Sequence, residues 1–138
     1  MKSLLEKHNL ILMEAAVVER LRRAGRVALH PDLVHAAFIY DDQGIKALEE
    51  IYQSYISIAV RANLPILLIT PTWRANYDRV QTSGVNPKIN SDSIGFMLDL
   101  RIRQDSDASM APSGKSTLVA TFSSDHSYWK ELCKEPER

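Results

Sequence analysis

Polar side chains follow two short apolar runs of the chain, and their chemistry suits a small zwitterion. The run Leu10–Met13 ends on Glu14, whose carboxylate can take up an ammonium group. The run Pro65–Thr70 leads into a turn with hydroxyl, indole, guanidinium and amide side chains, contributed by Thr72, Trp73, Arg74 and Asn76. Backbone N–H groups at such a junction can take up a carboxylate. Together these residues predict a binding site for a small amino acid, with Glu14 on its ammonium group.

Two parallel strands with a helix between them would position these residues. Neither apolar run alternates with polar residues, so both predict strands buried on two faces, as in parallel sheets. Residues 42–63 carry apolar side chains at steps of three and four, which predicts a long helix. Asp41 and Asp42 are both candidates for its N-cap, and Asn63 is the candidate for its C-cap. The resulting βαβ unit belongs to the α/β class. Because the carboxyl ends of parallel strands share one edge, we expect Glu14 and Thr72 at the same rim.

Further helices follow from the same spacing rule. The spacing predicts three more helices, over residues 15–23, 76–83 and 90–100. Polar residues within 91–93 are expected to cap the last of them. Beyond residue 100 the chain turns polar and rich in small residues. We therefore divide it into a folded part, residues 1–100, and a divergent, partly flexible C-terminal segment, residues 101–138. Within that segment, one short strand is predicted over 117–122 and one short helix over 125–134.

The same polar residues also allow a purely structural interpretation. Glu14 would cap the helix that follows it, and Thr72 would cap the helix that starts near Asn76. Polar residues at strand–helix junctions often have this role. Spacing alone therefore leaves both interpretations open.

Two segments of the chain carry a family pattern. The first is the apolar strand that ends on Glu14 and two alanines, followed by Glu19-Arg20-Leu21. The second is Leu67–Asn76, which contains a Thr-x-Thr-aromatic turn of the TPTWRAN type, and the helix over 90–100 fits after it. Over roughly residues 8–100, the chain resembles the homocysteine S-methyltransferase family.

The resemblance implies a (β/α)8 TIM barrel, of which this chain would hold a partial, N-terminal portion. In the family, zinc bound by cysteines lowers the pKa of the homocysteine thiol, and the thiolate attacks a methyl donor. The acidic residue after the first strand and the small residue beside it hold the amino-acid end of the substrate. That role falls here on Glu14 and the backbone of Ala15, with Thr72 and Trp73 lining the same pocket. The implied function is methyl transfer to homocysteine, as in methionine biosynthesis.

Two departures from the family pattern limit this expectation. Family members commonly have glycine where this chain has Ala15 or Ala16, and alanine resists a positive φ. The family's zinc cysteines lie in a later part of a barrel that needs about 250 residues. This chain has 138 residues and a single cysteine, Cys133. We therefore expect a truncated form that binds no zinc by itself, and assign it no catalytic residue and no metal ligand.

Composition and charge exclude several classes of protein. The 17 basic and 17 acidic residues cancel, so binding to nucleic acid has no electrostatic support, and the arginines within residues 20–26 are interpreted as a solvated helix face. No apolar run approaches the roughly 20 residues of a membrane span. The first eight residues lack the apolar core of a signal peptide. We therefore expect a cytoplasmic protein without nucleic-acid or membrane partners.

Two functions from different classes remain open. The first is a homocysteine S-methyltransferase-like protein whose site is incomplete. The second is a non-catalytic binding or interaction module that pairs with itself or with a full-length relative. A partial barrel leaves strand edges and apolar helix faces uncovered, and this exposure predicts self-association.

Overall fold

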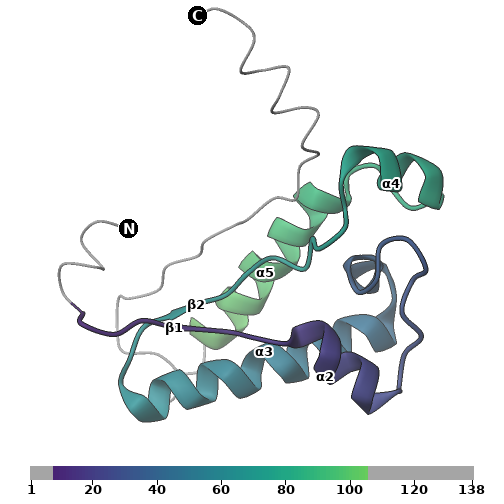
Figure 1. Cartoon of the computed structure of the whole chain (residues 1–138). Coiled ribbons are helices and arrows are strands. Elements are labelled where there is room, and N and C mark those ends of the chain that lie inside the picture. The colour runs from purple at the N-terminus through teal and green to yellow at the C-terminus, as the bar shows by residue number, and fades with distance from the viewer. Residues whose placement is uncertain (1–7, 106–138) are drawn as a thin grey trace, which may run out of the picture.

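The computed structural model describes residues 8–105, which form a mixed α/β fold in which helices predominate (Figure 1). Two short strands, β1 (Leu12–Met13) and β2 (Ile66–Leu67), form a parallel pair. The helices are α2 (Val17–Ala24), the 3-10 helix η1 (Ala36–Tyr40), α3 (Asp42–Ala62), α4 (Tyr77–Ser83) and α5 (Ile89–Asp105). The long helix α3 lies in the connection from β1 to β2, so the predicted βαβ unit is confirmed.

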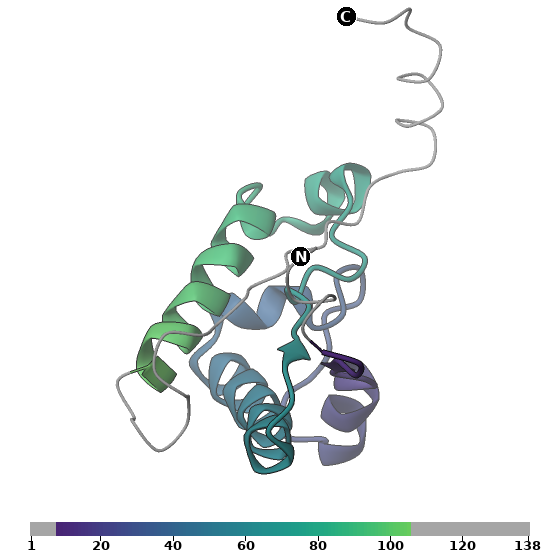
Figure 2. The same cartoon turned by 90° about the vertical axis from the view of Figure 1, so that its left-hand side faces the viewer.

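The two strands are shorter and more exposed than predicted. Leu12 pairs with Ile66 and Met13 with Leu67. Met13 is 60 % exposed, and both residues of β2 are only half-buried. The prediction of burial on two faces is therefore wrong for these strands. Figures 1 and 2 show the reason, because α3 and α5 both lie on the same side of the pair.

Helix ends in the first part of the chain follow local sequence signals. The carboxylate of Asp41 accepts the N–H of Gly44 at 2.6 Å and starts α3, while Asn63 ends it in the left-handed conformation, with φ 51°. Gly25 ends α2 in the same way, with φ 61°. The side chain of Asn76 starts α4 by accepting a backbone N–H. The helices predicted over 15–23, 42–63 and 76–83 are thus confirmed within one or two residues.

Helix α5 begins within one residue of the predicted start, but the predicted cap is wrong. The side chain of Asn86 accepts the N–H of Lys88 at 3.0 Å, and the helix begins directly afterwards at Ile89. Residues 91–93 therefore lie inside the helix and do not cap it. Ser93 is fully buried there.

The C-terminal segment predicted over residues 101–138 falls mostly outside the described residues, although α5 continues to Asp105. The strand predicted over 117–122, the helix predicted over 125–134 and Cys133 all lie there. These predictions, and the division of the chain at residue 100, stay predictions.

The core lies between η1, α3 and α5. Tyr52 of α3 is 1 % exposed, and the centroid of its ring lies 6.4 Å from that of Phe96 of α5. Leu21 of α2 and Val80 of α4 belong to the same cluster, and Leu68, just after β2, packs against it. This core holds α3 against the chain that follows β2 and thereby positions the strand ends.

Candidate functional site

The carboxyl ends of β1 and β2 meet, as parallel pairing requires. Glu14 follows β1 directly, and its backbone N–H donates to the carbonyl oxygen of Leu67 at 3.2 Å. The Glu14 side chain reaches the chain beyond β2, where its Oε2 accepts the N–H of Ile69 at 3.0 Å. The carboxyl ends of the two strands therefore share one edge, as predicted, and Glu14 contacts Ile69 there.

Glu14 is a buried carboxyl group. It is 6 % exposed, and burial raises its pKa above the ordinary value, an effect that the hydrogen bond from Ile69 partly opposes. Within residues 8–100, whose side chains the structure describes, the ion pairs join arginines to Glu19 and Glu50, and none involves Glu14. A buried carboxylate without a cation is unfavourable. An ammonium group placed beside Glu14 would relieve that cost and lower its pKa again.

The interpretation of Glu14 and Thr72 as helix caps is wrong for both residues. The N-cap position of α2 is Ala16, and no side chain caps that helix. The cap of α4 is Asn76, whose Oδ1 accepts the N–H of Arg79 at 3.1 Å. The carboxylate of Glu14 instead continues the bonding between the two strands beyond their regular ends. This bond gives Glu14 a structural role and also fixes it at the rim.

Tyr52 contacts the same segment, a role that sequence reasoning missed. Its hydroxyl donates to the carbonyl oxygen of Ile69 at 2.9 Å. Burial raises the pKa of Tyr52, and the nearby negative charge of Glu14 raises it further. The apolar stripe of residues 42–63 correctly predicts that Tyr52 is in the core. Nothing in that pattern indicates that its hydroxyl reaches the rim.

The turn after β2 buries its hydroxyl groups. Thr70 and Thr72 are each 2 % exposed, and their Oγ1 atoms lie 3.3 Å apart. The turn is tight, because the N–H of Thr72 donates to the carbonyl oxygen of Thr70 at 2.7 Å, and Arg74 has a positive φ of 66°. Trp73, between these residues, is 53 % exposed. The structure thus places Thr72 inside the turn and Trp73 on its solvent side.

The two alanines after Glu14 have different conformations. Ala15 is exposed, and its carbonyl oxygen accepts a hydrogen bond from the Tyr55 hydroxyl. Ala16 has φ 55° and ψ 30°, in the left-handed region that favours glycine. Of the two positions where family members commonly have glycine, Ala16 is the one with a positive φ. At Ala15, the residue expected to bind substrate, the backbone φ is not positive.

The described residues do not fit a metal ion. Across residues 8–105, no three His, Cys, Asp or Glu side chains come close enough to bind one. The zinc implied by the family resemblance therefore has no donor set in this part of the chain. Separately, none of the helices within these residues is long and apolar enough to cross a membrane.

Comparisons with known proteins do not extend these observations. The chain matches no protein-family model, no curated protein and no solved structure.

Proposed function

We propose that the rim formed by Glu14, Ala15, Thr72 and Trp73 binds the amino-acid end of homocysteine or a similar small amino acid. The Glu14 carboxylate pairs with the ammonium group of the ligand, and backbone N–H groups near Ala15 bind its carboxylate. One observation carries this proposal: Glu14 is buried where two parallel strands end, without a basic partner among residues 8–100.

The raised pKa of Glu14 gives the proposed site a pH dependence. An ammonium ligand favours the charged carboxylate, so binding releases a proton from the fraction of molecules in which Glu14 is protonated. Affinity for the ligand therefore increases as the pH rises through the pKa of Glu14. It levels off once the carboxyl group is fully ionised.

We also infer that the parallel pair belongs to a partial (β/α)8 barrel of the homocysteine S-methyltransferase type. The order of β1, α3 and β2 supports this inference, and so does the position of Glu14, because barrels bind ligands at the carboxyl ends of their strands. Since the described residues do not fit zinc, no methyl-transfer step is assigned to them. The function proposed for this part of the chain is binding.

The test is a calorimetric titration of the full chain with L-homocysteine under reducing conditions. Glu14→Gln keeps an acceptor for Ile69 but removes the charge, so we expect affinity to fall about thirtyfold or more, in line with the loss of one partner from a buried charge pair. Glu19→Gln is the matched control, because Glu19 lies on the exposed side of α2 and binds Arg22 and Arg23. 4-Mercaptobutanoate, which lacks only the ammonium group, should bind as weakly to the native chain as homocysteine binds to Glu14→Gln. Equal affinities of the two Glu→Gln variants would overturn the proposal.

A second candidate function is a non-catalytic module that self-associates. Leu10 is 57 % exposed and Met13 60 %, and both lie on or beside β1, whose only strand partner within the described residues is β2. Exposed apolar groups next to an open strand edge favour pairing between copies. Sedimentation velocity over a hundredfold concentration range tests this function. A mass that rises with concentration, and that Met13→Lys returns to the monomer value, would support it, whereas a constant monomer mass would exclude it.

A further inference from the structure

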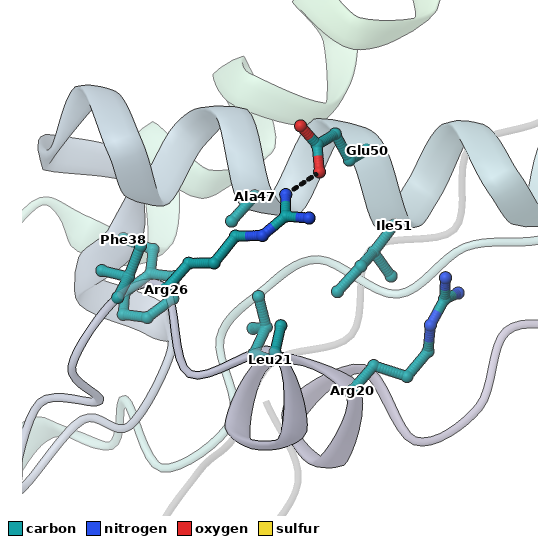
Figure 3. Close-up of a pocket in the computed structure, with 9 residues that line it drawn as sticks. Arg20, Leu21, Arg26, Phe38, Ala47, Glu50 and Ile51 are labelled. Atoms are coloured by element: carbon teal, nitrogen blue, oxygen red, sulfur yellow. Dashed lines mark hydrogen bonds and ion pairs between the residues drawn. The ribbon is translucent and has the colours of Figure 1, made fainter.

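A hollow lies between α2 and α3, apart from the proposed amino-acid rim. It is a cavity of about 280 Å³, lined by none of the four residues of the proposed amino-acid rim. Buried side chains of Leu21, Phe38 and Ile51 form its apolar part. Figure 3 shows Arg26 and Arg20 on either side of Leu21, with Arg26 extended across the cavity toward Glu50 on α3.

Both arginines at this cavity are held in place and retain donors. Arg26 Nη1 donates to Glu50 Oε2 at 2.9 Å, in a pair whose side chains are both largely exposed. Arg20 Nη1 donates to Ser54 Oγ at 2.8 Å, and its guanidinium carbon lies 4.8 Å from the centroid of the Tyr55 ring. A guanidinium group has five N–H donors, so one hydrogen bond leaves most of them available. The residues that line the cavity include two arginines and one carboxylate, that of Glu50, so their formal charges sum to one positive charge.

We propose that this cavity binds a small organic monocarboxylate with an apolar body. The apolar body packs on Leu21, Phe38 and Ile51, and the carboxylate pairs with the guanidinium groups. The single excess charge matches a monoanion. Drug-sized ligands occupy pockets of about 300–1,000 Å³, so a cavity just below that range fits a ligand built on one ring. Glu50 competes with the ligand for Arg26.

The test uses 4-fluorobenzoate as the probe, titrated with the full chain and followed by ¹⁹F relaxation. We expect Arg26→Gln to weaken binding about tenfold, because a charge-assisted bond is lost. Glu50→Gln should strengthen binding several-fold, because it removes the competing carboxylate. Neutral 4-fluorobenzyl alcohol should bind at least about tenfold more weakly than the carboxylate, since it forms no charge-assisted bond.

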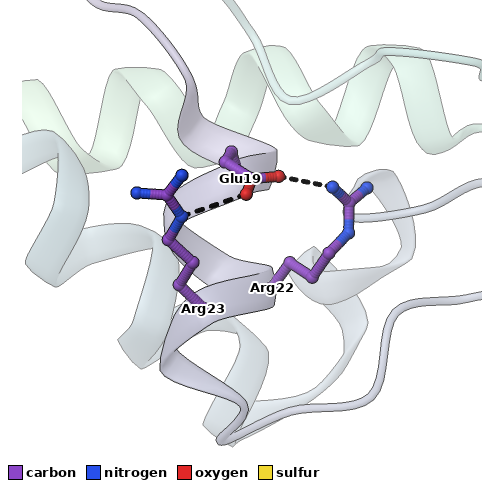
Figure 4. A network of polar contacts seen from close by, with 3 residues as sticks. All are labelled: Glu19, Arg22 and Arg23. Atoms are coloured by element: carbon purple, nitrogen blue, oxygen red, sulfur yellow. Dashed lines mark hydrogen bonds and ion pairs between the residues drawn. The ribbon is translucent and has the colours of Figure 1, made fainter.

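Arg22→Gln is the matched control. Arg22 lies in the last turn of α2, shortly before Arg26 in the chain, and carries the same charge. It binds Glu19, which also binds Arg23 at 3.0 Å, and none of these three residues lines the cavity (Figure 4). A general charge effect would weaken binding equally in the Arg22 and Arg26 variants, and that result would overturn the proposal. Equal binding of the alcohol and the carboxylate would also overturn it, as would a Glu50→Gln variant that binds no more tightly. Ala47→Leu, which enlarges a lining side chain, should abolish binding without changing charge.

Discussion

Glu14 and Tyr52 hold two backbone groups of the same residue, Ile69. The carboxylate of Glu14 accepts its N–H at 3.0 Å, and the hydroxyl of Tyr52 donates to its carbonyl oxygen at 2.9 Å. One side chain comes from the end of β1 and the other from the middle of α3. The segment after β2 is therefore fixed jointly by the proposed binding rim and by the core.

Tyr52→Phe tests the core side of this arrangement. The variant removes one hydrogen bond and leaves a carbonyl group of Ile69 without its partner, so we expect the free energy of unfolding to fall by about 1–2 kcal/mol. Urea denaturation measures the change. Tyr77→Phe is the control: Tyr77 is 74 % exposed, so this variant should lose little free energy of unfolding. Equal losses in the two variants would show that the hydroxyl of Tyr52 contributes nothing.

Glu14→Gln should make the fold more stable at neutral pH. The folded state raises the pKa of Glu14, so it favours the protonated form, and stability is lost as the pH rises through that pKa. Glutamine stays neutral and avoids this loss, which is about 1.4 kcal/mol for each unit by which the pKa is raised. Urea midpoints at pH 4 and pH 7 check the sign: the advantage of the variant should grow with pH. An advantage that is the same at both pH values would contradict a raised pKa.

His35 should make the fold sensitive to acid. It is 5 % exposed, its Nδ1 has no hydrogen-bond partner in the described part of the chain, and burial lowers its pKa from 6.5 to about 4. The unfolded chain therefore binds a proton first, and stability falls by about 1.4 kcal/mol per pH unit as the pH drops from 6.5 toward 4. His35→Gln should flatten this dependence.

The His35 measurement belongs in the Glu14→Gln background. Glu14 has a raised pKa and changes stability in the opposite direction over part of the same pH range. In that background, urea midpoints between pH 4 and 7 report His35 without this opposing change. An unchanged slope in His35→Gln would refute the assignment.

Two glycines should respond to alanine in opposite ways. A Cβ at Gly44 would lie 2.7 Å from the carbonyl oxygen of Phe38 and 2.8 Å from its Cα, so Gly44→Ala should cost about 1–3 kcal/mol through overpacking of α3 against η1. A Cβ at Gly95 meets nothing within 4 Å, so Gly95→Ala should stabilise α5 by about 0.5–1 kcal/mol. Thermal and urea denaturation of both variants test the pair. A destabilised Gly95→Ala variant would contradict the open surroundings of that position.

Ala16→Gly should stabilise the junction between β1 and α2. Ala16 has φ 55°, and a left-handed conformation costs a residue with a Cβ about 1–2 kcal/mol. Part of that gain is offset, because glycine makes the unfolded chain more flexible. Ala15→Gly is the control: its φ is not positive, so only the flexibility cost remains and stability should fall. Differential scanning calorimetry should therefore show a higher melting temperature for Ala16→Gly and a lower one for Ala15→Gly.

Helix α3 shows how much of this fold local sequence can predict. Asp41 and Asn63 act on backbone groups only a few residues away, so their caps follow from types and spacing alone. The meeting of Glu14 with the segment after β2 was also predictable, because parallel strands carry their carboxyl ends to one edge.

Other features depended on contacts between distant segments. The exposure of β1 and β2 follows from helices that cover one side of the pair, which the apolar runs do not reveal. The two strands and their order along the chain were predictable, but the extent of their burial was not.

The sequence by itself determined the helices α2, α3 and α4 with their ends, and the candidate carboxylate, because each depends on residue types and periodicity within a short stretch. The parallel pairing of the two strands followed from their order around the long helix. Only the tertiary structure decided that Glu14 is buried, that Tyr52 shares Ile69 with it, and that Arg20 and Arg26 border a cavity. The physical reason is that burial, and with it the pKa of a carboxyl group, depends on neighbours brought in from distant parts of the chain.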